Sequence, residues 1–309
     1  MRYDVGRMTA IHYDSRLTDE ERRARLYTGD LFVYSPTASS LRLVELARDM
    51  LAEAFAPRDP LFAQFSLPVE KYAQILATLK PAFIHHPACK QLLPAVLQEL
   101  GCDPQRTYFD VPRMRSAASG DYLTSGIAYA FHPHRDTWYS APFCQINWWI
   151  PVSHITADNC MAFHPHHWSA PLRNSSAQYN YQEWNRASRY QAAQQIGVDT
   201  RPQPHALEPV QLDPQIRLLP PPGGVIVFSG AQLHSTVPNT SNYTRFSVDF
   251  RSVHVDDAVA QRGAPNIDSY CTGSTMGDYL RCSDLAHLPE HATAAYDAGP
   301  PQRVSAANG

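Results

Sequence analysis

The sequence predicts a mainly β protein with flanking helices, in which short strands form a sandwich or a barrel. From about residue 107 onward, short runs rich in β-branched and aromatic residues follow one another, bounded by Pro, Gly and Asn. The 26 prolines favour turns and break long helices. Before residue 107, apolar residues recur at helical spacing instead. The runs expected to be strands are 107–111, 122–131, 143–152, 160–164, 224–229 and 243–254.

The N-terminal third is expected to be helix-rich. Over 18–55, Thr18 and Glu21 form the pattern of a capping box, in which each residue bonds the other's backbone N–H. A second helical run spans about 69–100 and is interrupted by Pro81 and Pro87. Both runs precede the strands and are expected to flank them.

Two further segments differ from the strand region. The segment 166–205 is polar with interspersed Trp and Tyr, and is expected to be either a lid packed over the barrel or a solvent-facing helical excursion. One short helix is expected near 276–287, followed by a Pro/Gly/Ala-rich end. The resulting division is a single domain over 1–309. Its parts are a helix-rich part (1–106), a β core (107–256) that carries the insertion 166–205, and a C-terminal extension (257–309).

Composition limits the class of protein. The chain has 309 residues and a formal charge of −3, which argues against a broadly cationic nucleic-acid surface. No apolar stretch approaches the roughly 20 residues of a membrane span. No apolar segment of a secretory signal stands near the N-terminus, and the six cysteines form no C-x-x-C pair. We therefore expect a cytoplasmic protein with reduced thiols that acts on a small molecule, without nucleic-acid or membrane partners. The oligomeric state is left open.

The pattern His-x-Asp places an imidazole nitrogen and a carboxylate oxygen close together. With a second histidine, these groups make the facial triad that holds iron on one face and leaves three coordination positions open. At strand spacing, His134 and Asp136 leave the same face. The tripeptide alone is weak evidence, because His12-x-Asp14 and His254-x-Asp256 repeat it.

The segment 220–251 selects among these copies. Gly223-Gly224 predicts a turn before a buried strand, and a second turn then presents His234. Arg245 follows eleven residues later, with Ser247 on the same strand face. A guanidinium beside a hydroxyl can hold a carboxylate by ion pairing and one further hydrogen bond. Only His134-x-Asp136 lies upstream of this unit with room for intervening strands, so the other two copies are interpreted as surface pairs.

This order of motifs resembles Fe(II)/2-oxoglutarate-dependent oxygenases, most closely the phytanoyl-CoA dioxygenase-like branch. The resemblance covers about 110–255: His134-x-Asp136, a strand with Gln145, Asn159 to Phe163, Pro-Gly-Gly and a strand, His234 and Arg245-x-Ser247. It implies a double-stranded β-helix core, the jelly-roll or cupin-like fold. One departure is His164-Pro165-His166-His167, where the branch often has Pro-Gly-Ser-His.

The resemblance also implies a metal centre and cosubstrates. Fe(II) would be held by His134, Asp136 and His234, and the far carboxylate of 2-oxoglutarate by Arg245 and Ser247. Gln145 stands where the branch often places a polar residue near the iron or the cosubstrate. With O2, such an enzyme releases succinate and CO2 and oxidises a C–H bond. Because position 136 is a carboxylate, the resemblance implies hydroxylation or a related oxidation such as desaturation or ring closure.

Three alternatives stay open from the sequence. A metal-binding cupin enzyme without 2-oxoglutarate would use His132 and His134, although no Glu follows at 138 or 139. A zinc hydrolase would use His164, His166 and His167, without an evident carboxylate partner. A non-catalytic jelly-roll binding protein would keep the fold and lose the iron.

The substrate is the least defined part of this hypothesis. The even charge balance and the polar insertion suggest a small polar metabolite, such as an amino acid, or a natural-product intermediate. Strand alternation places Gln145, Asn147 and Trp149 on one face and Cys144, Ile146 and Trp148 on the other. The candidate substrate residues are Trp138, Asn147, Trp149, Arg113, Arg115 and Arg173.

Overall fold

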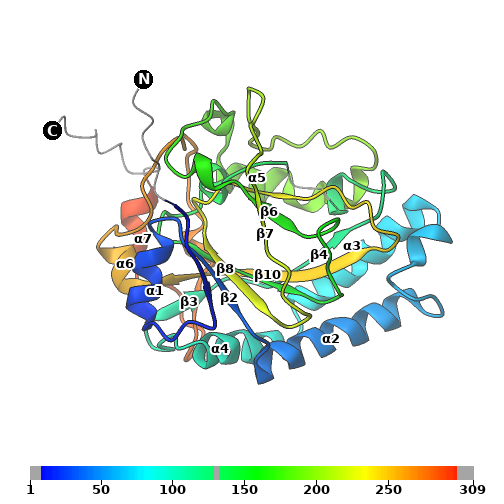
Figure 1. The fold of residues 1–309 in the computed structure, drawn as a ribbon, viewed down its shortest axis with the longest axis horizontal. Coiled ribbons are helices and arrows are strands. Elements are labelled where there is room, and N and C mark those ends of the chain that lie inside the picture. Colours follow the sequence, from blue (N-terminus) through cyan, green and yellow to red (C-terminus); the bar gives the residue numbers. More distant parts are fainter. Residues whose placement is uncertain (1–7, 129–131, 298–309) are drawn as a thin grey trace.

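Two β-sheets face each other in the computed structural model, which describes residues 8–128 and 132–297. The larger sheet has eight strands in the order β1-β2-β8-β5-β10-β3-β11, with β4 also paired to β10. The smaller sheet has the order β7-β6-β9. In Figure 1, β6 and β7 lie above the larger sheet. The predicted jelly-roll core with flanking helices is therefore confirmed.

The strands of the larger sheet come from both ends of the chain. Their bounds are β1 Ile11–Tyr13, β2 Leu31–Tyr34, β3 Thr107–Phe109, β4 Arg113–Ala117, β5 Ile146–Pro151, β8 Val225–Ser229, β10 Arg245–His254 and β11 Leu280–Arg281. The helix-rich N-terminal part thus contributes β1 and β2, and the C-terminal extension contributes β11. The strands of the smaller sheet are β6 Met161–Phe163, β7 Ile216–Arg217 and β9 His234–Thr236.

Alternation along β5 and β10 separates two environments. Trp148, Ile150 and Phe250 belong to the large core shared with the N-terminal helices. Trp149 belongs instead to a second core, together with Phe163 of β6 and residues of β8. This second core lies between the sheets, so the faces expected for 143–152 are confirmed.

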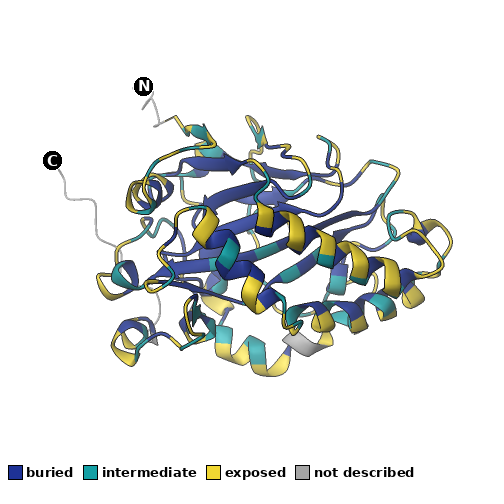
Figure 2. Ribbon diagram, turned by 90° about the horizontal axis from the view of Figure 1, so that it is seen from below, coloured by how far each residue is buried: buried dark blue, intermediate teal, exposed yellow. Residues whose placement is uncertain are grey.

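Three long helices cover the outer face of the larger sheet. They are α2 (Ala38–Phe55), α3 (Val69–Ile84) and α4 (Cys89–Glu99). Each buries an apolar stripe and exposes its other side, which Figure 2 shows as blue and yellow faces. Pro87 stands in the break before α4, as the sequence indicated, whereas Pro81 lies inside α3 and does not interrupt it.

Shorter helices complete the shell. They are α1 (Asp19–Leu26), α5 (Tyr181–Ala187), α6 (Val255–Val259) and α7 (Glu290–Asp297). Thr18 caps α1 through the predicted capping box with Glu21. Single 3₁₀ turns are η1 Ala63–Phe65, η2 Gly126–Ala128, η3 Asp136–Tyr139, η4 Pro165–His167, η5 Ser176–Gln178, η6 Arg189–Gln194 and η7 Met276–Asp278.

Several sequence-based predictions of elements were wrong. The run 122–131 contains the 3₁₀ turn η2 and no strand up to residue 128, and residues 129–131 lie outside the described chain. The helix expected at 276–287 is a 3₁₀ turn followed by β11. Strand β4 was not predicted, because Met114 and Ala117 are the only apolar residues among its five.

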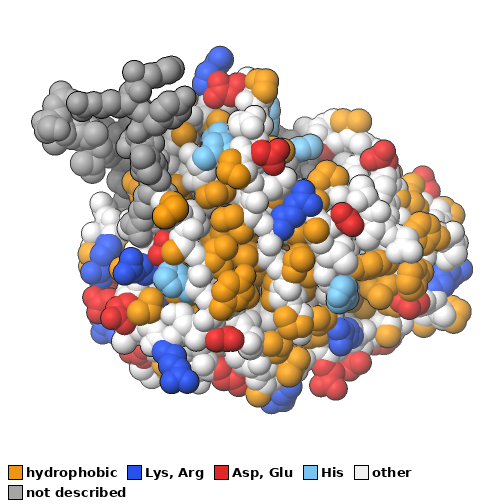
Figure 3. Space-filling model, viewed as in Figure 1, with side chains coloured by type: hydrophobic (Ala, Val, Ile, Leu, Met, Phe, Trp, Pro, Cys, Tyr) orange, Lys and Arg blue, Asp and Glu red, His pale blue; other side chains and the backbone are white. Residues whose placement is uncertain are grey.

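The insertion 166–205 lies above the smaller sheet, where Figure 1 shows α5. It is built from short turns and α5, and η6 contacts both η2 and α3. On the face shown in Figure 3, acidic and basic side chains are interspersed without a large region of one sign. Within the described residues, no helix has the length and apolar character needed to cross a membrane.

Candidate metal centre

Two histidines from distant parts of the chain pair directly through their backbones. The N–H of His134 donates to the carbonyl of His234, and the N–H of His234 donates to the carbonyl of His134, both at 3.0 Å. Residues paired in this way project their side chains from the same face of a sheet. The imidazole centroids are accordingly 4.3 Å apart.

Asp136 completes the cluster from a 3₁₀ turn and not from a strand. The sequence pattern placed His134 and Asp136 on one strand face, but η3 begins at Asp136. The turn brings the carboxylate back toward both rings. Its Oδ1 lies 3.5 Å from Nε2 of His134 and 3.9 Å from Nε2 of His234.

Backbone contacts fix the orientation of both imidazoles. Nδ1 of His134 lies 2.8 Å from the carbonyl oxygen of His132, and Nδ1 of His234 lies 2.9 Å from that of Gln232. A carbonyl can only accept, so each neutral ring carries its proton on Nδ1. The lone pair on each Nε2 then faces Asp136, which is the tautomer that a metal ligand needs.

Burial and charge determine the ionisation of the cluster. Burial, reinforced by His134, lowers the pKa of His234 to about 3, so this ring is neutral at physiological pH. Burial acts to raise the pKa of Asp136, but the two neighbouring histidines and the charge of Arg251 outweigh it and hold that pKa well below its usual range. The site therefore presents an ionised carboxylate and a neutral imidazole, both of which can donate an electron pair to a metal ion.

Amide groups hold the second oxygen of Asp136. Its Oδ2 accepts hydrogen bonds from Nε2 of Gln145 at 2.9 Å and from Nδ2 of Asn147 at 2.8 Å. Tyr279 donates in turn to Oε1 of Gln145 at 2.8 Å. The structure thus places Gln145 and Asn147 behind the carboxylate of Asp136, where they orient Oδ1 toward the histidines.

The donor set of this cluster fits a divalent transition metal. Ligand atoms of His134, Asp136 and His234 all lie within 4.8 Å of one another, and this is the one such group of three among the described residues. Two imidazole nitrogens and one carboxylate oxygen suit iron and leave open coordination positions. The triad predicted from the sequence therefore converges in space.

The other histidine motifs have different surroundings. His164 is fully buried between the carbonyl of Leu212 and the hydroxyl of Ser235, and Nε2 of His167 contacts the carbonyl of Gln211. His254 caps α6. Nothing in these contacts forms a three-ligand cluster in the described chain.

A buried guanidinium lies between the sheets near Trp149. Arg245 is 3% exposed, its NH1 donates to the hydroxyl of Ser247 at 2.7 Å, and its Nε donates to the carbonyl of Asn159 at 3.1 Å. Its charge lies over the ring of Trp149 at 5.5 Å. Burial lowers the pKa of Arg245 to about 10. Within the described residues, no carboxylate forms an ion pair with it.

The neighbouring arginines are paired with carboxylates. Arg115 bonds Asp249 through both Nε and NH2, at 2.6 and 3.3 Å. Arg113 donates to Asp110 at 2.5 Å. Arg251 lies 3.4 Å from Asp249 and 3.8 Å from the ligand Asp136. Arg245 therefore differs from the arginines beside it.

The remaining predicted substrate residues form contacts with groups other than the three residues of the metal cluster. Trp138 is fully buried and donates to Asp268, and it packs with Leu172 and Leu233. Arg173 is exposed in the insertion, where its backbone N–H bonds Glu208. Trp149 lies between the sheets, as described above.

Two site residues could not be found from the sequence. Arg135 stands between His134 and Asp136 and forms a buried ion pair with Asp268 at 3.1 Å. Tyr279 bonds Gln145, which in turn bonds Asp136. Asp268 and Tyr279 belong to the C-terminal extension, more than 130 residues after Arg135 and Gln145, which they contact. No local sequence pattern predicts these contacts.

Comparisons with known proteins give distant structural similarity. No protein-family model matches this chain, and the comparison with curated proteins finds no match. The fold is similar to that of EvdO2 from Micromonospora carbonacea var. aurantiaca, at 14% identity over 80% of this chain and 94% of that one, with a TM-score of 0.44. It is also similar to the non-heme monooxygenase ThoJ, at 16% identity over 75% and 76%, with a TM-score of 0.42.

A third similar structure is the epimerase SnoN in complex with Fe3+, α-ketoglutarate and nogalamycin RO, at 14% identity over 76% and 83%, with a TM-score of 0.40. At this level of similarity, the chemistry of the present chain has to be argued from its own site.

Proposed function

We propose that this protein is an Fe(II)/2-oxoglutarate-dependent oxygenase that oxidises a C–H bond of a small molecule. The observation that carries the proposal is the convergence of His134, Asp136 and His234, with both Nε2 lone pairs and one carboxylate oxygen facing a common point. A ferrous ion held there would supply the redox chemistry that uses O2 and 2-oxoglutarate and yields succinate, CO2 and an oxidised substrate.

Arg245 is the proposed anchor for the distal carboxylate of 2-oxoglutarate. A buried cation without a carboxylate partner is unfavourable in an apolar surrounding. A dianionic cosubstrate would relieve this cost, because the guanidinium retains donors beyond those that bond Ser247 and Asn159. Trp149 would form one wall of the pocket.

The chain's own residues keep the ligand carboxylate oriented. Gln145, Asn147 and Tyr279 direct one oxygen of Asp136 away from the metal position, so that the other faces it. The presence of this carboxylate as the third ligand supports hydroxylation, or a related desaturation or ring closure. The substrate class proposed from the sequence is a small polar metabolite or a natural-product intermediate.

Oxygen-dependent release of succinate tests the proposal. The purified full-length chain is incubated with Fe(II), 2-oxoglutarate and ascorbate in air or under nitrogen, and succinate is measured. We expect slow succinate release in air without any added substrate, and none under nitrogen. A metal-binding cupin would bind the metal but release no succinate, and a non-catalytic binding protein would do neither.

A further inference from the structure

A cavity of about 580 Å³ lies between the loop that leads into the metal centre and the insertion 166–205. This volume is in the range of pockets that hold drug-sized molecules. Its lining comes from 132–133 in that loop and from residues within 175–179 and 199–206.

The cavity adjoins the metal ligand His134. Its wall residue His132 accepts the hydrogen bond from Nδ1 of that ligand. On the other side, the hydroxyl of Tyr139 donates to the carbonyl of Pro204 at 3.0 Å. The Tyr139 ring packs edge-on against both His134 and the lining residue Tyr179, with centroids 5.5 Å apart in each case.

The cavity has no unbalanced formal charge from acidic or basic side chains. Asp199 and Arg201 are the only Asp, Glu, Lys or Arg residues in its lining. They pair with each other through two contacts, Nε to Oδ1 at 2.9 Å and NH2 to Oδ2 at 2.6 Å. Gln203 donates to the same carboxylate at 3.0 Å. A carboxylate, phosphate or ammonium group would find no unpaired charge of opposite sign among them.

The remaining lining offers neutral polar groups between flat apolar surfaces. The side-chain amide of Gln178 and Oε1 of Gln203 have no hydrogen-bond partner in the described chain. Nδ1 of His205 contacts the hydroxyl of Ser175 and the carbonyl of Gln203, which leaves its Nε2 available. Prolines 133, 202 and 204 and the ring of Tyr179 form the apolar part. Such surfaces suit ring faces, and the amides and imidazole suit hydroxyl or carbonyl groups.

We propose that this cavity binds the substrate, and that the substrate is an uncharged ring compound with several hydroxyl or carbonyl groups. An amino acid or a phosphorylated metabolite does not fit the paired charges. This inference rests on the proposed oxygenase function, because it places the oxidised molecule beside His134. It is narrower than the metabolite class stated above.

Matched probe pairs test the charge preference without turnover. The chain is titrated calorimetrically with 4-nitrophenyl glucoside and with 4-nitrophenyl glucuronide, which differ by one carboxylate. A second pair is 1,8-dihydroxyanthraquinone and its 3-carboxylate. We expect the uncharged member to bind at least about tenfold more tightly in each pair. Equal or tighter binding of the carboxylates, or no binding of any uncharged probe, overturns the proposal.

Two charge variants give opposite expected shifts. Asp199→Asn leaves Arg201 unpaired, so the affinity for the glucuronide should rise at least about tenfold relative to the affinity for the glucoside. Arg201→Gln leaves Asp199 unpaired, so the affinity for the cationic 4-nitrophenyl glucosaminide should rise relative to the affinity for the glucoside. Glu183→Gln removes an exposed charge from α5 of the same insertion and should change neither ratio. Folded variants with unchanged ratios would show that the probes bind elsewhere, which contradicts the proposal.

Failure of this inference is separable from failure of the oxygenase proposal. Succinate release from Fe(II) and 2-oxoglutarate depends on the metal centre and the Arg245 pocket, whereas probe binding depends on the cavity. If the protein releases succinate but binds the carboxylate probes more tightly, the oxygenase proposal is supported and the proposal of an uncharged substrate is contradicted.

Discussion

The two oxygens of Asp136 have different surroundings, and this division is the feature of the site most sensitive to substitution. One oxygen faces the two imidazoles, and the other accepts from Gln145 and Asn147. A neutral amide at position 136 could satisfy the hydrogen bonds only in part. A methyl group would provide neither a ligand nor an acceptor.

Asp136→Ala is therefore expected to remove metal binding. Because the site loses its only anionic ligand, we expect metal affinity to fall by more than about 100-fold and succinate release to stop. The measurement is metal content after dialysis against Fe(II) or Mn(II). Asp256→Ala, which removes the exposed carboxylate of the His254-x-Asp256 copy, is the matched control and should retain the metal. Metal retained by Asp136→Ala would mean that this carboxylate is not a ligand.

Arg245→Ala separates the cosubstrate pocket from the metal centre. Removing a buried charge that pairs with a carboxylate costs about 2 kcal/mol or more, so the Kd for 2-oxoglutarate should rise at least about 30-fold. Metal content should not change, because Arg245 contacts none of the three ligands. Arg217→Ala, on the exposed side of β7, is the control. An unchanged Kd would assign the anchor to another cation, and Arg251 on the same strand is the next candidate.

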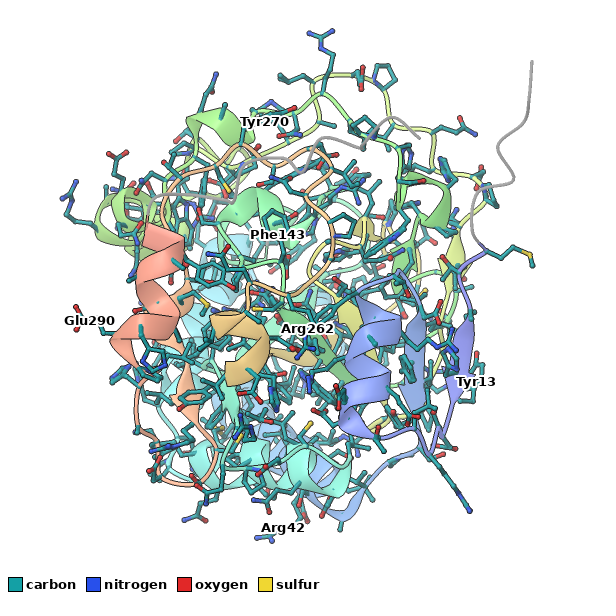
Figure 4. All side chains as sticks on the ribbon, turned by 90° about the vertical axis from the view of Figure 1, so that its left-hand side faces the viewer. Tyr13, Arg42, Phe143, Arg262, Tyr270 and Glu290 are labelled. Atoms are coloured by element: carbon teal, nitrogen blue, oxygen red, sulfur yellow. The ribbon has the colours of Figure 1, made fainter. Side chains whose placement is uncertain are left out.

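At the scale of elements, the buried carboxylate of Asp257 joins α1 and α6. It is fully buried and accepts from Arg23 and Tyr27 at 2.8 Å each, and from Arg262 at 2.6 Å. Figure 4 shows Arg262 between these two helices. One side chain of the C-terminal extension thus fixes the position of an N-terminal helix.

Asp257→Ala should destabilise the whole fold. The substitution breaks a buried ion pair and leaves Arg23 with Asp19 as its remaining carboxylate partner, and breaking a buried pair costs about 3–5 kcal/mol. Urea unfolding followed by circular dichroism measures the difference. Asp284→Ala removes an exposed partner of Arg281 and should leave the midpoint unchanged. Equal midpoints for Asp257→Ala and the unaltered protein would show that the two helices pack without this contact.

Helix α3 carries a lysine that makes stability depend on pH. Lys80 donates to the carbonyl of Ile127, and burial, assisted by the charge of Arg115, lowers its pKa from 10.5 to about 7. Between pH 7 and 10.5 the unfolded chain therefore holds a proton that the folded chain has released. The free energy of unfolding rises with pH in this window, by at most about 1.4 kcal/mol per unit.

Lys80→Met should remove the contribution of this lysine to the pH dependence of the free energy of unfolding. Urea unfolding at pH 7.5 and 9.5 compares it with the unaltered protein and with Lys71→Met, an exposed lysine on the same helix. The free energy of unfolding should differ less between the two pH values in Lys80→Met than in the other two proteins. Identical slopes in all three proteins would mean that Lys80 remains charged in the folded state.

The elements also show where sequence patterns succeed. Strand β5 is a mostly apolar run and β10 alternates polar and apolar residues, so the positions of both strands were predicted, and Arg245 and Ser247 with them. The error at 122–131 has a tertiary cause. Gly126 has a φ of +59° and lies so close to the carbonyls of Ala192 and Gln195 that a Cβ would meet them at 2.4 and 2.3 Å. A turn packed on the insertion replaces the expected strand.

At the scale of the whole molecule, the site combines segments that no local pattern relates. The sequence indicated the three ligands because each lies in a recognisable motif. It did not indicate Asp268, Tyr279 or the cavity, because these depend on how the insertion and the C-terminal extension pack. Arg135 illustrates this point, since it bonds Asp268 and the carbonyls of Ala231 and His167. One buried side chain thus ties the metal loop to both later segments.

Ligand binding should therefore stabilise the fold as a unit. The proposed metal would contact His134 and His234, which pair through an isolated bridge at β9 of the smaller sheet, and the cosubstrate would contact Arg245 on β10 of the larger sheet. Ligand at 100 times its Kd adds about 2.7 kcal/mol to the free energy of unfolding, which corresponds to a rise of about 5 °C in Tm. Scanning calorimetry with Mn(II) and 2-oxoglutarate, compared with EDTA, measures this rise. Asp136→Ala should show no rise with either ligand, and Arg245→Ala should respond to Mn(II) but gain little more from 2-oxoglutarate. A rise of the same size in all three proteins would place the binding outside the triad and its arginine.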